Sequence, residues 1–451
     1  MESILLQQRA YFLDNKSKPL SRRLNVLSHL KMVIENHQEQ LQNAILEDFG
    51  KSHYESYMTE IGMIYQEIDR AIKKLPKWAR IKKVPNNMVN FPGKSYIMPE
   101  PLGNTLVIGA WNYPIQLALI PCVAALAAGN TVILKPSELP SKTAAVIEQM
   151  INENFDPAIM HVINGDVSVT TELLQHKFDK IFFTGSTKVG QIVYEAAAKH
   201  LTPVTLELGG KSPVIIDEDV DLEIAVKRIV WAKFINAGQT CVAPDYIYVH
   251  EKVAGRFINL VTSFIKKQEY SVENRNYVQI INDKNFDRLT QLIDKDKILY
   301  GGKSDKATRV VHPTVLYPVT WADAVMQEEI FGPIMPIMTY TDLNDILPII
   351  KSKDKPLALY LFTNRAVVKN EVLRHISFGG GCINDTMMHL SNPNLPFGGV
   401  GTSGMGSYHG KYGFDTFSHF KSVLDKSTIF EPNIKYAPYT PIKEKIVQKL
   451  M

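Results

Sequence analysis

Cys241 lies in a segment that could position a nucleophile. Residues 238–244 read GQTCVAP, and their glycine and proline indicate a shaped turn. Most lone cysteines are small buried hydrophobes, which is the better interpretation of Cys122 in an apolar run and of Cys382 after three glycines. A thiol attacks carbon when positive charge or helix-end amides lower its pKa. Cys241 is therefore the candidate nucleophile.

Two polar residues at the ends of apolar runs could assist such a thiol. Glu207 interrupts the run 204–208, where a carboxylate must be ion-paired or functional because unpaired burial is costly. Desolvation would raise its pKa and suit it to general-base work. Asn112 follows another run, and its amide could bind an oxyanion, although asparagine before Tyr-Pro is also an ordinary turn residue.

Two further segments could hold a cofactor. Lys135 and Glu138 follow the run 131–134, and the pair could hydrogen-bond two ribose hydroxyls because the carboxyl ends of parallel strands line the ligand crevice. A surface ion pair that caps the next helix explains them equally well. The turn 185–190 joins a strand to a helix, whose N-terminus favours phosphate. It lacks the Lys-Ser/Thr of a Walker A loop, and alone it is most simply a glycine turn.

The glycine-rich segment 391–413 contains a formal G-x-G-x-x-G match at 399–404. A dinucleotide fingerprint needs a strand before it and a helix after it, whereas prolines precede this match and aromatic residues follow it. We interpret the segment as a tight loop between domains.

Short apolar runs alternate with helical segments after residue 104, which predicts a parallel α/β sheet covered on both faces and then a second α/β domain. The predicted strands are Leu106–Ile108, Thr131–Leu134, Met160–Ile163, Lys180–Phe183, Val204–Leu208, Val214–Ile216, Tyr246–Val249, Thr314–Tyr317 and Leu357–Phe362. The first hundred residues read as helical, and the Pro- and Asn-rich stretch 85–101 reads as an excursion from the main body.

The composition is that of an ordinary globular protein. The chain has 451 residues, 45% hydrophobic and 21% charged, with a net charge of +4. This length favours two or three domains, and the small charge excess gives no reason to expect a nucleic-acid partner, so the basic stretch 73–83 is interpreted as a solvated helix face. Three scattered cysteines predict neither disulfides nor a metal site. No secretory signal or span of roughly 20 apolar residues is predicted, and we expect a cytoplasmic protein.

Seven segments, in chain order and from end to end, resemble the aldehyde dehydrogenase superfamily. They are GAWNYP at 109, ILKPSE at 133, FTGSTKVG at 183, LELGGKSP at 206, GQTC at 238, EEIFGP at 328 and LPFGGVGTSGMG at 395. Each segment alone is weak evidence, but all seven occur in the same order as in the family, which a chance match would not give. GQTCVAPDY and HGKYGFDTFSHFKSVL resemble the class 3 branch, whose dimeric enzymes act on medium- and long-chain aliphatic and aromatic aldehydes.

The resemblance implies a catalytic role for three residues. Cys241 would attack the aldehyde to give a thiohemiacetal, with its oxyanion held by the Asn112 side chain and the Cys241 backbone N–H. Hydride transfer would leave a thioester, and Glu207 would activate the water that hydrolyses it.

The same resemblance implies contacts to NAD, with NADP as an alternative, and no metal. Lys135 and Glu138 resemble contacts to the adenosine ribose, and a Glu138 carboxylate there would repel a 2′-phosphate, which favours NAD slightly. The remaining cofactor contacts implied are Gly185, Ser186 and Gly190 at the pyrophosphate, and Glu329 and Phe331 at the nicotinamide side.

The family fold implies a Rossmann-like parallel-sheet cofactor domain, an α/β catalytic domain and a small β oligomerisation extension. We assign residues 1–82 and 102–208 to the first, 209–410 to the second, 83–101 and 411–430 to the extension, and 431–451 to a C-terminal tail. The extension implies a homodimer. The tail mixes lysine with isoleucine, valine and leucine, so we expect it to cover the substrate entrance or to touch a membrane surface.

Three alternatives to an acid-forming dehydrogenase stay open. A dehydrogenase or reductase that transfers the acyl group to coenzyme A can lack a base at Glu207, so the presence of this residue favours hydrolysis. A non-catalytic binding protein would need none of the three catalytic candidates. A cysteine hydrolase would need a histidine partner, and the nearest in sequence is His250. Aliphatic, aromatic and terpenoid (carotenoid-derived) aldehydes would all suit an apolar channel.

Overall fold

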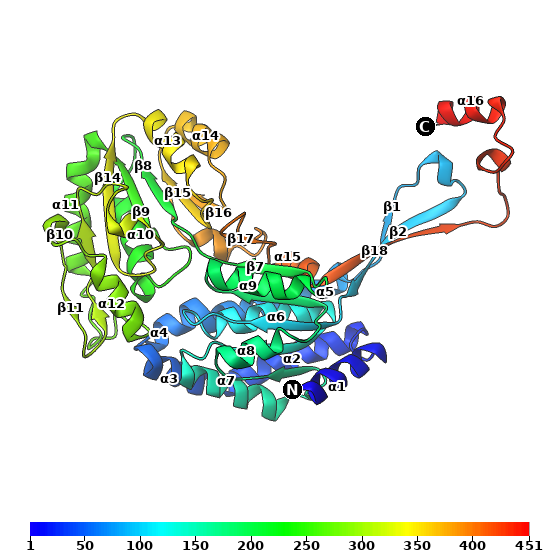
Figure 1. Ribbon diagram of the computed structural model, residues 1–451, viewed down its shortest axis with the longest axis horizontal. Coiled ribbons are helices and arrows are strands. Elements are labelled where there is room, and N and C mark those ends of the chain that lie inside the picture. Colours follow the sequence, from blue (N-terminus) through cyan, green and yellow to red (C-terminus); the bar gives the residue numbers. More distant parts are fainter. Residues whose placement is uncertain (451) are drawn as a thin grey trace.

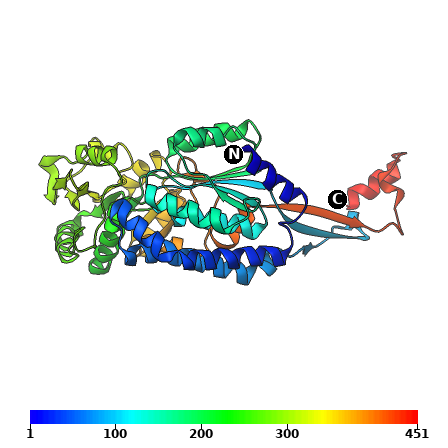
Figure 2. The same ribbon diagram turned by 90° about the horizontal axis from the view of Figure 1, so that it is seen from below.

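Two parallel sheets, each flanked by helices, occupy the two lobes of the molecule (Figure 1). A computed structural model describes residues 1–450. A third, small sheet projects from one lobe and carries the C-terminal segment at its far end (Figures 1 and 2). The fold is therefore of the α/β class with parallel sheets, as the alternation of apolar runs and helical segments predicted.

The first sheet has six strands in the order β17-β7-β6-β3-β4-β5, and only β17 runs antiparallel to its neighbour. The strands are β3 (Asn104–Ile108), β4 (Thr131–Lys135), β5 (Met160–Val162), β6 (Lys180–Thr184), β7 (Val204–Glu207) and β17 (Gly404–Met405). Strand β3 pairs with β4 on one side and β6 on the other, so the strand order reverses beside β3. Ligands of open α/β sheets bind at the carboxyl ends of strands at such a reversal.

Nine helices precede or connect these strands. They are α1 (Glu2–Leu13), α2 (Leu20–Asn36), α3 (Gln38–Phe49), α4 (His53–Ser56), α5 (Gly62–Trp78), α6 (Gln116–Ala128), α7 (Ser141–Asn154), α8 (Val167–Leu173) and α9 (Thr187–Ala198). Every residue of α6 is buried because α6 lies between the sheet and the N-terminal helices α2 and α5. This apolar segment is therefore a core helix.

The second sheet has seven strands in the order β10-β13-β14-β9-β8-β15-β16, parallel except at β10. The strands are β8 (Pro213–Ile216), β9 (Tyr246–His250), β10 (Ile298–Tyr300), β13 (Thr314–Leu316), β14 (Ile334–Tyr340), β15 (Ala358–Phe362) and β16 (Gly380–Ile383). A separate hairpin pairs β11 (Ser304–Asp305) with β12 (Val310–Val311). The helices of this lobe are α10 (Leu222–Phe234), α11 (Glu251–Lys267), α12 (Asp283–Gln291), α13 (Leu343–Ser352) and α14 (Ala366–His375).

The third sheet joins β1 (Lys82–Val84), β2 (Gly93–Pro101) and β18 (Ser418–Lys426) in antiparallel register. All nine residues of β18 pair with β2, so the predicted excursion near 85–101 is a strand paired to a segment more than 300 positions later in the chain. Helix α15 (Gly410–Thr416), just before β18, packs on α5 and α6 in the main body.

The C-terminal helix α16 (Pro441–Leu450) lies at the far end of this sheet and buries none of its residues (Figure 1). None of the helices within residues 1–450 is both long enough and apolar enough to span a membrane. No described tail residue lines the cavity at Cys241, so α16 does not cover that cavity within one chain, contrary to one of the two expectations for the tail.

All nine predicted strands form, but three strands of the second sheet were missed, namely β10, β14 and β16. Strand β14 contains Pro336, and β16 begins with Gly380 and Gly381, residues that disfavour strands in isolation. Both strands form because parallel neighbours pair with them. The glycine-rich segment is a loop, as predicted, and its β17 returns the chain from the second sheet to pair with β7.

Candidate active site

Cys241 follows a strained connection at the end of α10. The 3-10 turn Ile235–Gly238 places Asn236, Ala237 and Gly238 in the left-handed region, with φ of 52°, 51° and 71°. A non-glycine residue held there costs about 1–3 kcal/mol, so the surrounding structure must impose the conformation. Gly238 is required for a second reason, because a Cβ atom there would lie 2.4 Å from the Gly332 carbonyl oxygen. The turn that the sequence indicated is therefore a rigid one.

The hydrogen bonds of Gln239 hold this loop in its conformation. Its amide nitrogen donates to the carbonyl oxygens of Asn236 and Gln279, both at 3.1 Å, and its amide oxygen accepts from the Ile281 N–H at 3.0 Å. The Gln239 carbonyl accepts from the side-chain amides of Asn112 at 3.0 Å and Asn236 at 3.1 Å. Every polar atom of this side chain is therefore used to fix the backbone two residues before the thiol.

Asn112 lies beside this loop, directly after β3. Its side chain is buried, and its Nδ2 donates one bond, to the Gln239 carbonyl. The Asn112 carbonyl accepts from Lys51 Nζ at 3.2 Å, and Lys51 forms a fully buried ion pair with Glu60 at 2.7 Å. An amide carries two N–H groups, so the geometry leaves one for a ligand.

Glu207 ends β7 at the carboxyl edge of the first sheet, only 2% exposed. Neither of its carboxylate oxygens has a hydrogen-bond partner within residues 1–450. Burial raises its pKa well above the usual 4.5. An unpartnered buried carboxyl is costly, and such groups are typically functional. The carboxylate that the sequence pattern singled out as ion-paired or functional therefore has no partner within the described residues.

The Cys241 thiol is half-buried and surrounded by acidic groups. Burial, together with the nearby carboxyls of Glu329 and Glu207, raises the pKa of the thiol to about 12. Positive surroundings were the condition that we set for a reactive thiol, and here the neighbouring charges have the opposite sign. The thiol is therefore protonated at neutral pH and must transfer its proton to an acceptor before it can attack.

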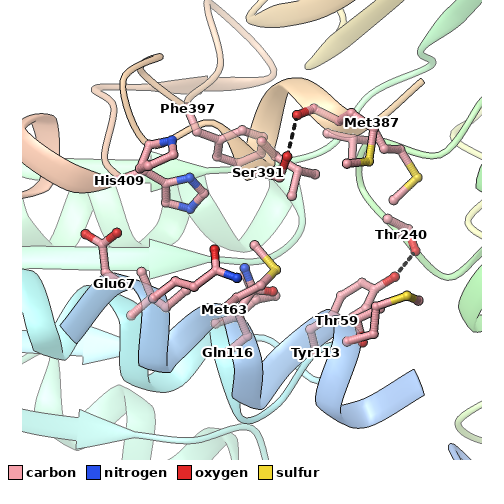
Figure 3. Close-up of a pocket in the computed structure, with 18 of the residues that line it drawn as sticks. Thr59, Met63, Glu67, Tyr113, Gln116, Thr240, Met387, Ser391, Phe397 and His409 are labelled. Atoms are coloured by element: carbon pink, nitrogen blue, oxygen red, sulfur yellow. Dashed lines mark hydrogen bonds between the residues drawn. The ribbon is translucent and has the colours of Figure 1, made fainter. Parts of the chain in front are cut away.

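A cavity of about 260 Å³ opens on the thiol (Figure 3). Its lining is mainly apolar and includes four methionines and several aromatic and aliphatic side chains. The methionines are Met58, Met63, Met387 and Met388. Figure 3 shows Thr240, bonded to the Tyr113 hydroxyl at 2.7 Å, at one end and Glu67 with His409 at the other. The cavity can hold an elongated apolar molecule with one end at the thiol.

Lys135 and Glu138 lie together at the carboxyl end of β4. Lys135 Nζ is buried and donates to the Pro136 carbonyl at 2.7 Å, with Glu138 Oε2 at 3.5 Å. Burial lowers the pKa of Lys135. The pair does not cap α7, whose first backbone N–H groups instead donate to Asp48. Of the two interpretations left open, the capping one is wrong.

The turn at 185–190 lies beside Glu207 on the neighbouring strand. The Gly185 N–H donates to the Glu207 carbonyl at 3.0 Å, and the Ser186 hydroxyl accepts from the Val189 N–H at the start of α9. A Cβ at Gly190 would lie 2.7 Å from a Leu208 methyl group, so glycine lets α9 approach the sheet. The exposed Ser186 side chain and the helix N-terminus together suit a phosphate.

Glu329 and Phe331 reach the same region from the second sheet. The Glu329 carboxyl rests on Gly209, where a Cβ would lie 2.2 Å from its Oε2, and burial raises its pKa to about 8. The Phe331 ring packs edge-on against Trp111 at 5.3 Å between centroids, one residue from Asn112. The structure therefore brings segments 109–114 and 328–333 together.

A dinucleotide fits the residues that line the space between the sheets. A cavity of about 340 Å³ is lined by Thr187 at the start of α9, by Gly209 and Gly210, and by Glu329. The buried Thr184 hydroxyl at the end of β6 has no partner within residues 1–450. An unpartnered hydroxyl, a glycine-walled cavity and a helix N-terminus thus lie together beyond the carboxyl ends of β6 and β7, the edge of a parallel sheet at which such ligands bind.

The sequence patterns missed the residues that support the thiol and the cavity. Gln239 and Asn236 are adjacent to Cys241 in sequence, but their bonds go to segments that no local pattern connects, including Glu55, whose carboxylate accepts from the Asn236 N–H at 3.0 Å. The only signal was the cluster of amide side chains before the cysteine. The cavity lining gave no local signal at all, since it combines α5, α6 and the segment 387–409.

The comparisons with known proteins agree with this geometry. The model of the aldehyde dehydrogenase family matches residues 4–423. The 4,4′-diaponeurosporen-aldehyde dehydrogenase of Staphylococcus aureus is 46% identical over 97% of this chain and 96% of its own length. The dimeric NADP-preferring aldehyde dehydrogenase of Rattus norvegicus is 45% identical over 97% of each chain.

A solved structure described as the substrate-bound state of Staphylococcus aureus AldH superposes with a TM-score of 0.97, at 46% identity, over 99% of this chain and 98% of that one. Family 3 enzymes occur among the other relatives, which confirms the predicted class 3-like branch. The chain belongs to the aldehyde dehydrogenase family and is an oxidoreductase that oxidises aldehydes with NAD(P).

Proposed function

We propose that Cys241 is the nucleophile and Glu207 the base of an aldehyde oxidation that releases the free acid. The main support is that neither carboxyl oxygen of Glu207 has a hydrogen-bond partner within residues 1–450. This carboxyl is also close enough to Cys241 to raise the pKa of the thiol. Burial raises the pKa of this carboxyl, so its carboxylate is a stronger base than an exposed one, which suits general-base work. Every other buried acid near the thiol has a partner or rests against the backbone.

The reaction has two stages on this chain. The thiol loses its proton and its sulfur bonds to the aldehyde carbon, while the free Asn112 N–H and the Cys241 backbone N–H hold the oxyanion. NAD(P) supplies the acceptor for the hydride that leaves the same carbon when the carbonyl reforms, which gives a thioester on Cys241. Water that gives a proton to Glu207 then adds to the thioester, the carbon–sulfur bond breaks, and the acid leaves.

We propose long or bulky apolar aldehydes, including carotenoid-derived ones, as substrates. The support is the narrow apolar cavity with four methionines, since the unbranched thioether adapts to varied shapes. The name of the Staphylococcus aureus relative, which specifies a carotenoid-derived aldehyde, points in the same direction.

The cofactor contacts are part of the same proposal. Lys135 and Glu138 would hold the adenosine ribose, Ser186 with Gly185 and Gly190 the pyrophosphate, and Glu329 with Phe331 the nicotinamide side. The partly exposed Glu138 carboxylate favours NAD, whereas the name of the rat relative specifies an NADP preference, so turnover with both forms is expected.

We also propose a cytoplasmic homodimer, with the domain boundaries given above. The extension supports dimerisation because the β18 side chains are largely exposed on both faces and β18 is an edge strand. Edge strands with open faces are commonly covered by a partner. The name of the rat relative describes that enzyme as dimeric.

The test is the appearance of NADH or NADPH absorbance with purified protein and aldehydes of increasing length, with and without coenzyme A. Turnover without coenzyme A is expected. The value of kcat/KM should rise by about fourfold for each methylene group that the cavity buries, up to its length. Product formation only in the presence of coenzyme A would instead establish the acylating alternative.

Replacing Asn112 with alanine should lower kcat by about 10²–10³-fold, because it removes one oxyanion donor. The control is Asn236→Ala, which removes bonds to the carbonyls of Gln239 and Asn112 but no proposed oxyanion contact. Steady-state rates and melting temperatures of both variants separate the roles. Equal loss of kcat in the two variants would show that Asn112 only anchors the loop.

A further inference from the structure

A second hollow, of about 850 Å³, lies where α5 meets the projecting sheet. Its lining carries five cationic side chains from the end of α5 and the start of β1. They are Arg70, Lys74, Lys77, Arg80 and Lys82, and we call this hollow the basic groove. Arg70 and Pro393 line both the basic groove and the cavity at Cys241. The two hollows are therefore neighbours with a shared wall.

One face of α5 connects them. Met63, Glu67, Arg70, Lys74 and Lys77 follow one another at intervals of three or four residues, which places them on one side of the helix. The first three line the substrate cavity and the last three line the basic groove. A molecule that leaves the apolar cavity along α5 thus meets a cationic surface.

The charge of the basic groove is not balanced by the protein. None of these five cations forms an ion pair within residues 1–450, and the single acid in the lining, Asp415, pairs with a sixth lining cation, Lys411, at 2.6 Å. The acidic side chains of α5 have other partners, since Asp69 pairs with Lys31 and the buried Glu67 accepts from the Gly410 N–H. A concave surface with this unbalanced charge attracts an anionic partner.

Exposed apolar side chains accompany the cations. Ile81 and Tyr412 are 47% and 39% exposed, and Tyr412 lines the basic groove itself. Basic residues interleaved with exposed aromatic and aliphatic ones are typical of surfaces that lie against anionic lipid. A nucleic acid would meet the same charge, but it would have no use for the neighbouring apolar cavity.

We infer that the basic groove docks on an anionic bilayer, so that an apolar aldehyde passes from the lipid into the cavity along α5. This inference rests on the proposed apolar substrates. The basic stretch 73–83, which we interpreted from the sequence as a solvated helix face, would then contact the lipid surface. The contact is made by the main body at the cavity and not by the tail.

The test compares the full chain with Lys74→Gln/Lys77→Gln/Lys82→Gln. All three side chains are exposed, and Arg70 in the cavity wall is kept. The matched control neutralises three exposed lysines on other helices, Lys199→Gln/Lys227→Gln/Lys267→Gln. Binding is measured by co-sedimentation with vesicles of phosphatidylcholine alone and of equal parts phosphatidylcholine and phosphatidylglycerol. Each lysine near such a surface contributes about fivefold in affinity, so the triple variant should bind the anionic vesicles about a hundredfold more weakly than the control.

Activity provides the second readout. With a long-chain aldehyde dissolved in anionic vesicles, the triple variant should lose rate in proportion to its lost binding. With a short water-soluble aldehyde its kcat/KM should match that of the unaltered protein. Absence of any turnover on the soluble aldehyde would count against the proposed function, whereas normal soluble activity with vesicle binding equal to the control would overturn the docking surface alone.

Two further outcomes would also overturn it. Vesicle binding that survives in the triple variant but disappears when residues 436–451 are removed would assign lipid contact to the tail. Tighter binding of a short DNA duplex than of anionic vesicles at the same salt would assign the basic groove to nucleic acid.

Discussion

Replacing Cys241 with alanine is expected to abolish aldehyde oxidation, with a fall in kcat of about 10⁴-fold or more, because no other group can carry the acyl intermediate. Cofactor binding should persist, since the proposed cofactor contacts come from the end of β4, from the segments after β4 and β6, from α9 and from the segment before β14, and Cys241 is not among them. The loop should also keep its conformation, because its bonds are made by Gln239 and Asn236 and not by the thiol. Steady-state absorbance and quenching of protein fluorescence by the added cofactor measure the two properties.

Cys382→Ala is the matched control for this variant. Cys382 is also half-buried, in β16, with its Sγ 3.5 Å from His389 Nδ1, and it lines neither the substrate cavity nor the cofactor cavity. Its replacement should leave kcat within about twofold, as for most sites away from the reacting atoms. Turnover retained in Cys241→Ala, or lost equally in Cys382→Ala, would remove Cys241 from the nucleophile's role.

Replacing Glu207 with glutamine should permit one rapid round of hydride transfer and then stop the enzyme at the thioester. The expected burst is about one NADH per active site, followed by a steady-state rate about 10²–10⁴-fold lower, which is the usual contribution of a general base. Rapid-mixing absorbance resolves the two phases, and mass spectrometry of the quenched protein detects the acyl group. A normal steady-state rate would show that another group activates the water.

The same substitution should stabilise the protein, and more so at alkaline pH. The folded-state pKa of Glu207 lies above its unfolded value, so its stability contribution is fully present below the unfolded pKa and is lost as pH rises through the folded pKa. Glutamine has no such titration. The gain should therefore be larger at about pH 8 than at about pH 5, because only the carboxyl, and not the amide, can ionise in the buried site. Thermal melts at both pH values measure it.

Strand positions were predictable from sequence because buried parallel strands are apolar throughout and leave a local signal. The same argument located Glu207, since a carboxylate at the end of such a strand stands out. It failed for β16, whose glycines give no strand signal, and for β14, whose proline contradicts one. Their pairing is decided by neighbours far away in the chain.

The supporting contacts of the thiol were beyond prediction for the same reason. Gln239 bonds with Gln279 and Ile281, about 40 positions away, and with Asn112, more than 120 positions away. The acidic surroundings of Cys241 likewise arise because β7 and the segment around Glu329 converge on it. Spacing within a motif carries no information about such convergence, so the direction of the thiol's pKa shift required the structure.

The chain passes between the two large sheets twice, once from β7 to β8 and once from β16 back to β17. The proposed base, Glu207, lies on the first sheet, and the proposed nucleophile, Cys241, lies just ahead of β9 in the second. Buried side chains of both sheets also belong to one continuous hydrophobic core, so the sheets pack together as well as being connected twice. The separation of these two residues therefore depends on how the two sheets pack, so substitutions in the connecting segments that alter this packing are expected to lower the rate without touching either residue.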